Sequence, residues 1–161
     1  MDDISLMRAA LEAAAGNPDE VPVGAVVARG GQIVAAAANA QAGRNDPLAH
    51  AEMLALAAAR EALGTGRLDG CEMFVTLEPC PMCAGAILLS GVSRLVFGAF
   101  DTQYGCCGSV YALPMDPVFH RFVACEGGLL QDEAKALLDA FFGRIRGKGP
   151  GENPPAAWLE V

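Results

Sequence analysis

The sequence predicts one α/β domain of three layers, with helices on both faces of a central sheet. Segments of helical periodicity and short apolar segments follow one another in the order α-β-β-α-β-α-β-β-α. The chain has 161 residues, of which 53% are hydrophobic, so it can enclose an apolar core in a single domain. This apolar content also excludes an intrinsically disordered protein.

The first part of the chain predicts a helix followed by a β-hairpin. Apolar residues recur at helical spacing over residues 4–14, and Gly16 can end that helix. Residues 21–28 form an apolar run with strand character, and residues 33–38 form a second one. The turn residues at 29–32 separate the two runs, which favours a hairpin.

A loop and a second helix are predicted next. Residues 39–45 are expected to form the loop. Asp46 is a good N-cap, and Pro47 suits the first helical position because its missing N–H is not needed there. An Ala-rich helix is therefore predicted from this point to about Leu63.

The remaining elements alternate between strands and helices. Residues 73–77 predict a short buried strand, and a helix is predicted over residues 81–89. Residues 95–98 and 122–124 are two further strand candidates. The last helix is expected over residues 130–146, where leucine, isoleucine and phenylalanine side chains share one apolar face.

The end of the chain differs in composition from the rest. Residues 147–155 hold three Gly and three Pro, which are typical of a loose terminal segment. We therefore divide the chain into a domain at residues 1–146 and a flexible tail at residues 147–161.

Charge and hydropathy exclude several classes of protein. The net charge of −8 argues against a protein that coats nucleic acid through bulk charge, but it allows a local basic patch such as Arg144, Arg146 and Lys148. No run of 18 uncharged apolar residues occurs, so we expect no membrane span. The acidic start of the chain is unlike a secretory signal, and we expect a cytoplasmic protein.

The strongest chemical signal is a set of zinc-ligand residue types. The chain has six cysteines, too few for a disulfide scaffold at this size. Cys80 and Cys83 stand in the sequence Pro79-Cys80-Pro81-Met82-Cys83, at the predicted start of a helix whose positive end would stabilise both thiolates. His50 can supply a third ligand, and three protein ligands leave the fourth position of a catalytic zinc open.

Two plainer interpretations of the cysteines stay open at this point. One is a structural zinc site, which normally needs four protein ligands. The other is a pair of ordinary core cysteines. His120 and the cysteines outside the motif do not repeat any ligand spacing; these are Cys71, Cys106, Cys107 and Cys125.

Glu52 is the candidate catalytic residue, because hydrolysis at a zinc site needs a group that carries protons. A catalytic zinc lowers the pKa of water towards about 7, so hydroxide is available at neutral pH. Residues two apart lie on roughly opposite sides of an ideal helix, with about 3.6 residues per turn. Glu52 and His50 can therefore reach one site only if the site lies off the helix end.

His-x-Glu followed by Pro-Cys-x-x-Cys is the signature of the zinc deaminases that act on nucleobases. Beyond this signature the chain closely resembles the bacterial tRNA adenosine deaminases, the TadA family of the cytidine deaminase-like superfamily. The resemblance covers roughly residues 4–146. It is carried by residues 21–26, Asn39, 45–52, 75–86, 96–99, Asp101, 108–109 and 141–142.

The resemblance implies a fold, an activity and partners. The fold would be the three-layer α/β/α cytidine deaminase-like fold, with a central five-stranded mixed sheet. The activity would be hydrolysis of adenosine to inosine at the wobble position of a tRNA anticodon, with one Zn²⁺ per subunit. The partners would be the tRNA anticodon stem-loop and a second copy of the chain in a homodimer.

The resemblance also implies substrate-binding residues. Asn39 would hydrogen-bond the flipped base, although it could equally be a turn residue. The backbone at Ala51 and Glu78 would contact the reacting ring. Val23 and Leu48 would form walls of the base pocket. Asp101 would lie near the ribose. Phe141 and Phe142 would stack on anticodon bases.

These last assignments have structural alternatives. Val23 could belong to the ordinary core, and Asp101 could be a solvated loop residue. At least one of the two phenylalanines could pack the last helix against the sheet.

Two other functions remain as alternatives. One is a free-base deaminase such as guanine deaminase, which shares the His-Ala-Glu and Pro-Cys-Pro-Met-Cys motifs. The other, from a different class, is a non-catalytic zinc-containing RNA-binding subunit. The presence of Glu52 argues against a silent subunit, which would not need a proton carrier.

Overall fold

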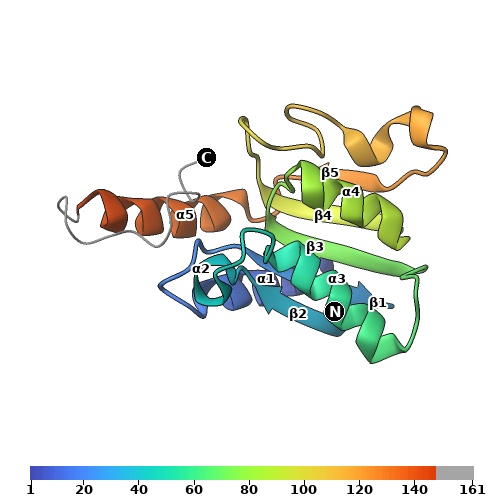
Figure 1. The fold of residues 1–161 in the computed structure, drawn as a ribbon, viewed down its shortest axis with the longest axis horizontal. Coiled ribbons are helices and arrows are strands. Elements are labelled where there is room, and N and C mark those ends of the chain that lie inside the picture. Colours follow the sequence, from blue (N-terminus) through green and yellow to red (C-terminus); the bar gives the residue numbers. More distant parts are fainter. Residues whose placement is uncertain (148–161) are drawn as a thin grey trace.

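The computed structural model describes residues 1–147 (Figure 1). The helices are α1 Asp3–Ala15, α2 Gln41–Arg44, α3 Ala51–Leu63, α4 Pro81–Ser90 and α5 Gln131–Arg146. The strands are β1 Gly24–Arg29, β2 Gln32–Ala38, β3 Cys71–Leu77, β4 Arg94–Ala99 and β5 Ala124–Gly127. Two short 3-10 turns, Leu113–Met115 and Pro117–Phe119, lie in the long connection before β5. The tail predicted at residues 147–161 lies outside the described residues except for Gly147.

The sheet is mixed and five-stranded, in the order β2-β1-β3-β4-β5. β1 pairs in antiparallel fashion with both β2 and β3, whereas β3, β4 and β5 run parallel. The α/β fold class expected from the sequence is confirmed. None of the helices within residues 1–147 has the length and apolarity that crossing a membrane requires.

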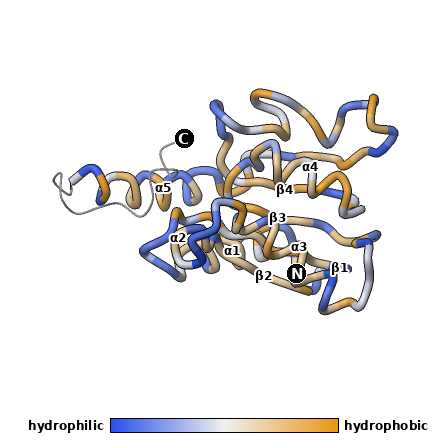
Figure 2. Tube along the Cα trace, in the orientation of Figure 1, coloured by the Kyte–Doolittle hydropathy of each residue, from blue (hydrophilic) through white to orange (hydrophobic). Residues whose placement is uncertain are grey.

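Alternate residues of the central strands face opposite layers, as the period of a β-strand dictates. Met73 and Val75 of β3 belong to the core under α3 and α4, while Phe74 between them belongs to the core under α1. β4 repeats this alternation. Both faces of the central strands are therefore buried, and these strands and α4 are strongly hydrophobic parts of the trace (Figure 2).

Three predicted boundaries are wrong for identifiable reasons. The loop expected at 39–45 contains the short helix α2. Helix α3 starts at Ala51 instead of Pro47, because the Asp46 carboxylate accepts a hydrogen bond from the Leu48 N–H at 2.9 Å and so closes a turn. The last strand pairs with β4 from Ala124 onward, beyond the predicted residues 122–124.

The topology brings several chain segments to one edge of the sheet. β3 and β4 are parallel, so the segments that follow Leu77 and Ala99 leave the sheet at the same end. β2 runs in the same direction as β3, because both are antiparallel to β1, so it delivers α2 and α3 to that end as well. Helix α5 extends past the sheet there (Figure 1). Ligands of open α/β sheets bind outside such carboxyl ends.

Candidate active site

His50, Cys80 and Cys83 come together as the sequence predicted, with their ligand atoms all within 4.8 Å of one another. The Nδ1 atom of His50 lies 3.6 Å from the Cys80 sulfur and 3.5 Å from the Cys83 sulfur. Tetrahedral zinc, with bonds of about 2.0–2.1 Å to nitrogen and about 2.3 Å to sulfur, requires an N···S separation of about 3.6 Å. The three side chains therefore fit one zinc ion. Within residues 1–147 the group has three members, which is the ligand number of a catalytic site.

Helix starts hold all three ligands. Cys80 is the N-cap of α4, Pro81 occupies its first turn and Cys83 follows, as predicted. His50 is the N-cap of α3, with extended backbone at φ −72° and ψ 149°. Both helices thus direct their positive ends at the same point, which stabilises bound thiolate and hydroxide charge.

The surroundings of Cys80 favour its thiolate form. Hydrogen bonds from Cys83 and then from His50 lower the pKa of Cys80 to about 4, against the opposing effect of burial. The pKa of Cys83 is raised, chiefly because its thiol proton is held by Cys80. The hydrogen bond to Cys80 also raises the pKa of His50. The thiolate is the form of cysteine that binds metal.

Glu52 lies beside this group, at the second residue of α3, and its side chain is 4% exposed. Burial raises the pKa of the Glu52 carboxyl to about 7. The neighbouring Cys83 thiol acts in the opposite direction and lowers this pKa in part. A carboxyl that titrates near neutral pH can both take up and release a proton at the site.

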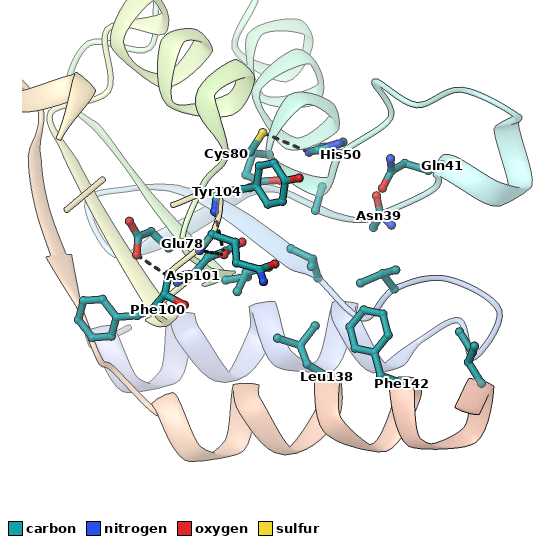
Figure 3. Close-up of a pocket in the computed structure, with 18 of the residues that line it drawn as sticks. Asn39, Gln41, His50, Glu78, Cys80, Phe100, Asp101, Tyr104, Leu138 and Phe142 are labelled. Atoms are coloured by element: carbon teal, nitrogen blue, oxygen red, sulfur yellow. Dashed lines mark hydrogen bonds between the residues drawn. The ribbon is translucent and has the colours of Figure 1, made fainter. Parts of the chain in front are cut away.

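A cavity of about 770 Å³ opens onto these residues, a size suited to a nucleotide-sized ligand (Figure 3). His50, Glu52 and Cys80 lie in its wall. The residues that sequence reasoning assigned to substrate and that line the same cavity are Val23, Asn39, Ala51, Glu78, Asp101 and Phe142.

Asn39 carries an unpaired polar group at this cavity. Its side chain is 4% exposed. Among the buried side-chain nitrogen and oxygen atoms of residues 1–147, the Asn39 Nδ2 is the one without a hydrogen-bond partner. The backbone N–H of Asn39 donates to the Val23 carbonyl, which fixes the residue at the end of β2. Since buried amide groups are normally paired, this one is suited to donate to a ligand.

Two predicted substrate residues lie elsewhere. Leu48 is 60% exposed, in the turn before α3, and it does not line the cavity. Phe141 is 4% exposed and packs edge-to-face against Phe142, with ring centroids 5.3 Å apart. Phe141 and Phe142 are consecutive residues on α5, so they point about 100° apart, and one packs inward while the other faces the cavity.

Several cavity residues were not predicted. Leu138 of α5 lines the cavity with Phe142, four residues further on (Figure 3). Ile145, three residues after Phe142, also lines it. The sequence predicted the apolar face of this helix, but not that part of the face lines a cavity. The other cavity residues without a prediction are Val21, Gln41, Leu77, Phe100, Thr102, Gln103 and Tyr104, whereas Arg146, which also lines the cavity, belongs to the predicted basic patch. The turn at 102–104 follows the carboxyl end of β4, where such sites form.

The chain matches the family model of the cytidine and deoxycytidylate deaminase zinc-binding region over residues 1–99. It is 44% identical to the tRNA-specific adenosine deaminase of Bacillus subtilis over 91% of this chain and 92% of that protein. The enzyme of the same name from Aquifex aeolicus is 42% identical over 79% of this chain and 83% of the relative.

Solved structures agree with this placement. One, from work on A-to-I editing by tRNA:A34 deaminases at the wobble position of transfer RNA, superposes with a TM-score of 0.79. It is 40% identical and covers 83% of this chain and 99% of its own. Guanine deaminase from Nitrosomonas europaea is more distant in sequence, at 31% identity, with a TM-score of 0.77 over 88% of this chain and 85% of its own. The chain therefore belongs to the tRNA-specific adenosine deaminases, a family within the zinc-binding cytidine and deoxycytidylate deaminases.

Proposed function

We propose that this protein is a zinc-dependent hydrolase that converts adenosine to inosine at the wobble position of a tRNA anticodon. The observation that carries the proposal is the geometry of the site. His50 and Cys80, two of the three ligands spaced for one zinc ion, and the buried Glu52 carboxyl line a nucleotide-sized cavity, and Cys83 lies beside them within ligand distance. Membership of the tRNA-specific family selects the substrate class.

The reaction replaces the exocyclic amine of adenine with an oxygen atom from water and releases ammonia. Zinc, when bound by His50, Cys80 and Cys83, supplies hydroxide at neutral pH and charge stabilisation for the attack. Glu52 carries one proton of the attacking water to the ring nitrogen, and then carries the remaining hydroxyl proton to the amine, which departs as ammonia. Its burial next to Cys83 keeps this transfer away from bulk solvent.

The remaining cavity residues orient the nucleotide. The unpaired Asn39 amide donates a hydrogen bond to an acceptor on the base, and Val23 and Ala51 enclose the ring. Asp101, which lines the same cavity, is the residue that we assign to the ribose. Phe142 on α5 stacks on a neighbouring anticodon base, a role that its position in the cavity wall supports.

The basic residues at the end of α5 are the candidates for phosphate binding. Arg146 lines the cavity, and Arg144 belongs to the last turn of the same helix. Both are candidates for contacts to the anticodon backbone, which are salt-sensitive. Lys148, the third member of the predicted basic cluster, lies outside the described residues.

We further propose that the protein works as a homodimer in the cytoplasm, where tRNA is available. The dimer is supported by large apolar side chains left exposed on the end of α4 and the connection that follows β4. They are Leu89 at 69%, Val110 at 44%, Tyr111 at 68%, Val118 at 67%, Phe119 at 48% and Phe122 at 67%. Apolar groups gathered on one surface mark protein contacts.

The decisive experiment measures both classes of substrate with the purified zinc-loaded protein. An anticodon stem-loop with adenosine at the wobble position is incubated and sequenced for inosine, and ammonia release is assayed from free guanine, cytosine and adenine. We expect inosine in the RNA and no ammonia from the free bases. Ammonia from guanine with unedited RNA would instead support the guanine deaminase alternative. Inactivity on every substrate would support the non-catalytic subunit.

A further inference from the structure

A second buried glutamate lies close to the site, at the end of β3 and two residues before the zinc ligand Cys80. The side chain of Glu78 is 2% exposed, yet the five ion pairs formed within residues 1–147 do not include it. A buried carboxylate is costly unless hydrogen bonds compensate for lost hydration. Its partners therefore indicate what the side chain is for.

All of those partners belong to one segment, residues 101–109, which we call the wall segment. One carboxylate oxygen accepts hydrogen bonds from the Asp101 N–H, at 3.2 Å, and from the Ser109 hydroxyl. The other accepts from the Cys107 N–H at 3.2 Å and from the Ser109 N–H at 3.0 Å. The wall segment thus wraps around a single carboxylate, which satisfies three of its backbone N–H groups.

The close approach depends on Gly105. A Cβ atom at this position would overlap the Glu78 carboxylate and the Asp101 carbonyl oxygen. The Cys106 N–H also donates to the Pro79 carbonyl at 2.9 Å. The wall segment is therefore tied to the same stretch of chain that presents Cys80 to the metal.

The first residues of the wall segment form part of the cavity wall. Asp101, Thr102, Gln103 and Tyr104 all line the cavity. The Asp101 side chain accepts hydrogen bonds from the N–H groups of Gln103, at 2.9 Å, and Tyr104, at 3.0 Å, and so shapes this turn. Because Glu78 holds the Asp101 N–H, it holds the turn through Asp101 (Figure 3).

We propose that Glu78 is a positioning residue, whose carboxylate holds the wall segment in place as a preformed surface for the tRNA nucleotide. Its effect is on substrate binding, through residues 101–104, and the proton transfers remain with Glu52. The inference rests on the proposed function for the identity of the substrate. Preorganised binding surfaces lower the cost of ordering a loop when the ligand arrives.

The test compares Glu78→Gln with the wild type as full-length, zinc-loaded protein. The substitution keeps the shape but turns one acceptor oxygen into an NH₂ group that faces N–H donors. We expect KM for an anticodon stem-loop to rise about tenfold and kcat to stay within about threefold. Zinc content by elemental analysis should be unchanged, and backbone hydrogen exchange across the wall segment should become faster.

Three variants separate positioning from general destabilisation. Gly105→Ala should raise KM in the same way, because it disturbs the same contact while leaving Glu78 intact. Val96→Ala, in the core under α1, should lower Tm without changing KM or exchange in the wall segment. Ser109→Ala removes only the hydroxyl donor and provides a milder variant if Glu78→Gln fails to fold.

The outcomes separate this inference from the proposed function. Unchanged KM and unchanged exchange in Glu78→Gln would overturn it, and so would loss of zinc with a collapse in kcat. If the wild type leaves the stem-loop unedited, the proposed function fails, while the substrate-free exchange measurement still decides whether Glu78 holds the wall segment.

Discussion

Glu52 is the second residue of the helix that His50 caps, and this relationship brings two side chains that are two residues apart to one site. Inside a helix they would diverge, but His50 has extended backbone and stands just outside α3. Glu52, at the second helical position, leans back towards the helix start. The metal ligand and the proton carrier therefore face the same cavity, together with Ala51 between them.

This arrangement predicts a clean separation of chemistry from metal binding. Glu52→Ala should retain zinc and fold, since Glu52 lies outside the ligand group, but turnover should fall by about 10²–10⁴-fold. Single-turnover kinetics on a stem-loop and elemental analysis of zinc check the two halves. Full activity in this variant would remove Glu52 from the mechanism.

Ligand substitutions should act on the metal and on stability together. His50→Ala or Cys83→Ala breaks a three-ligand set that ties α3 to α4. Structural zinc binding can be worth about 10–16 kcal/mol, so even partial loss should lower Tm visibly. Metal content and thermal unfolding are measured in parallel. Cys71→Ala, a buried cysteine outside the group, is the control and should keep its zinc.

Removal of the Asn39 amide should weaken transition-state binding. Its Nδ2 finds no protein partner in the described chain, so a ligand acceptor is its expected partner. Asn39→Ala should lower kcat/KM by about 10–100-fold, corresponding to about 1–3 kcal/mol for a lost buried hydrogen bond. Steady-state kinetics on the stem-loop provide the measurement. An unchanged kcat/KM would support the turn-residue alternative.

The two phenylalanines of α5 should respond differently to truncation. Phe141→Ala should cost stability on the order of 3 kcal/mol, because this ring is 4% exposed. Phe142→Ala should instead raise KM for the stem-loop with a smaller loss of stability, since its ring faces the cavity. Urea unfolding and KM values for the pair test this division. Equal effects of both on KM would contradict the observed packing.

Arg94 forms ion pairs with Asp3, Glu72 and Glu126, and these pairs predict how stability depends on pH. Hydrogen bonds from Arg94 lower the pKa values of Asp3 and of Glu126. A carboxyl whose pKa is lowered by folding stabilises the fold above its unfolded value, about 4, and loses this effect as pH falls through the folded value. Arg94→Met should therefore lose stability at pH 7 and show a shallower decline towards pH 3.

The magnitude is modest because the acids are partly exposed, with side chains 42% exposed for Asp3 and 60% for Glu126. We expect about 1 kcal/mol in total after solvent screening. Urea unfolding at pH 7 and pH 3 measures it. Arg8→Met is the matched control, because its ion pair with Glu133 is exposed on both sides and should matter less. A steeper acid decline in Arg94→Met would reverse the assigned sign.

The sequence alone predicted the layered α/β fold and the metal site, for a local reason. Cys80 and Cys83 share one helix start marked by Pro81, so their mutual placement needs no distant contact. The paired strands around the turn at 29–32 were likewise set by neighbours in sequence. The start of α3 is one of the boundaries that the sequence did not predict, because the Asp46 carboxylate closes a turn instead of a helix.

Tertiary packing decided what periodicity left open. An apolar stripe on α5 was predictable, but only the neighbouring sheet determines that Phe141 is covered and Phe142 faces the cavity. Leu48 is exposed for the same kind of reason, since no element covers that turn within the described chain. Glu78 gains its four donors from a segment more than twenty residues away. Long-range hydrogen bonds and burial depend on which segments meet in space, and that information lies in the fold.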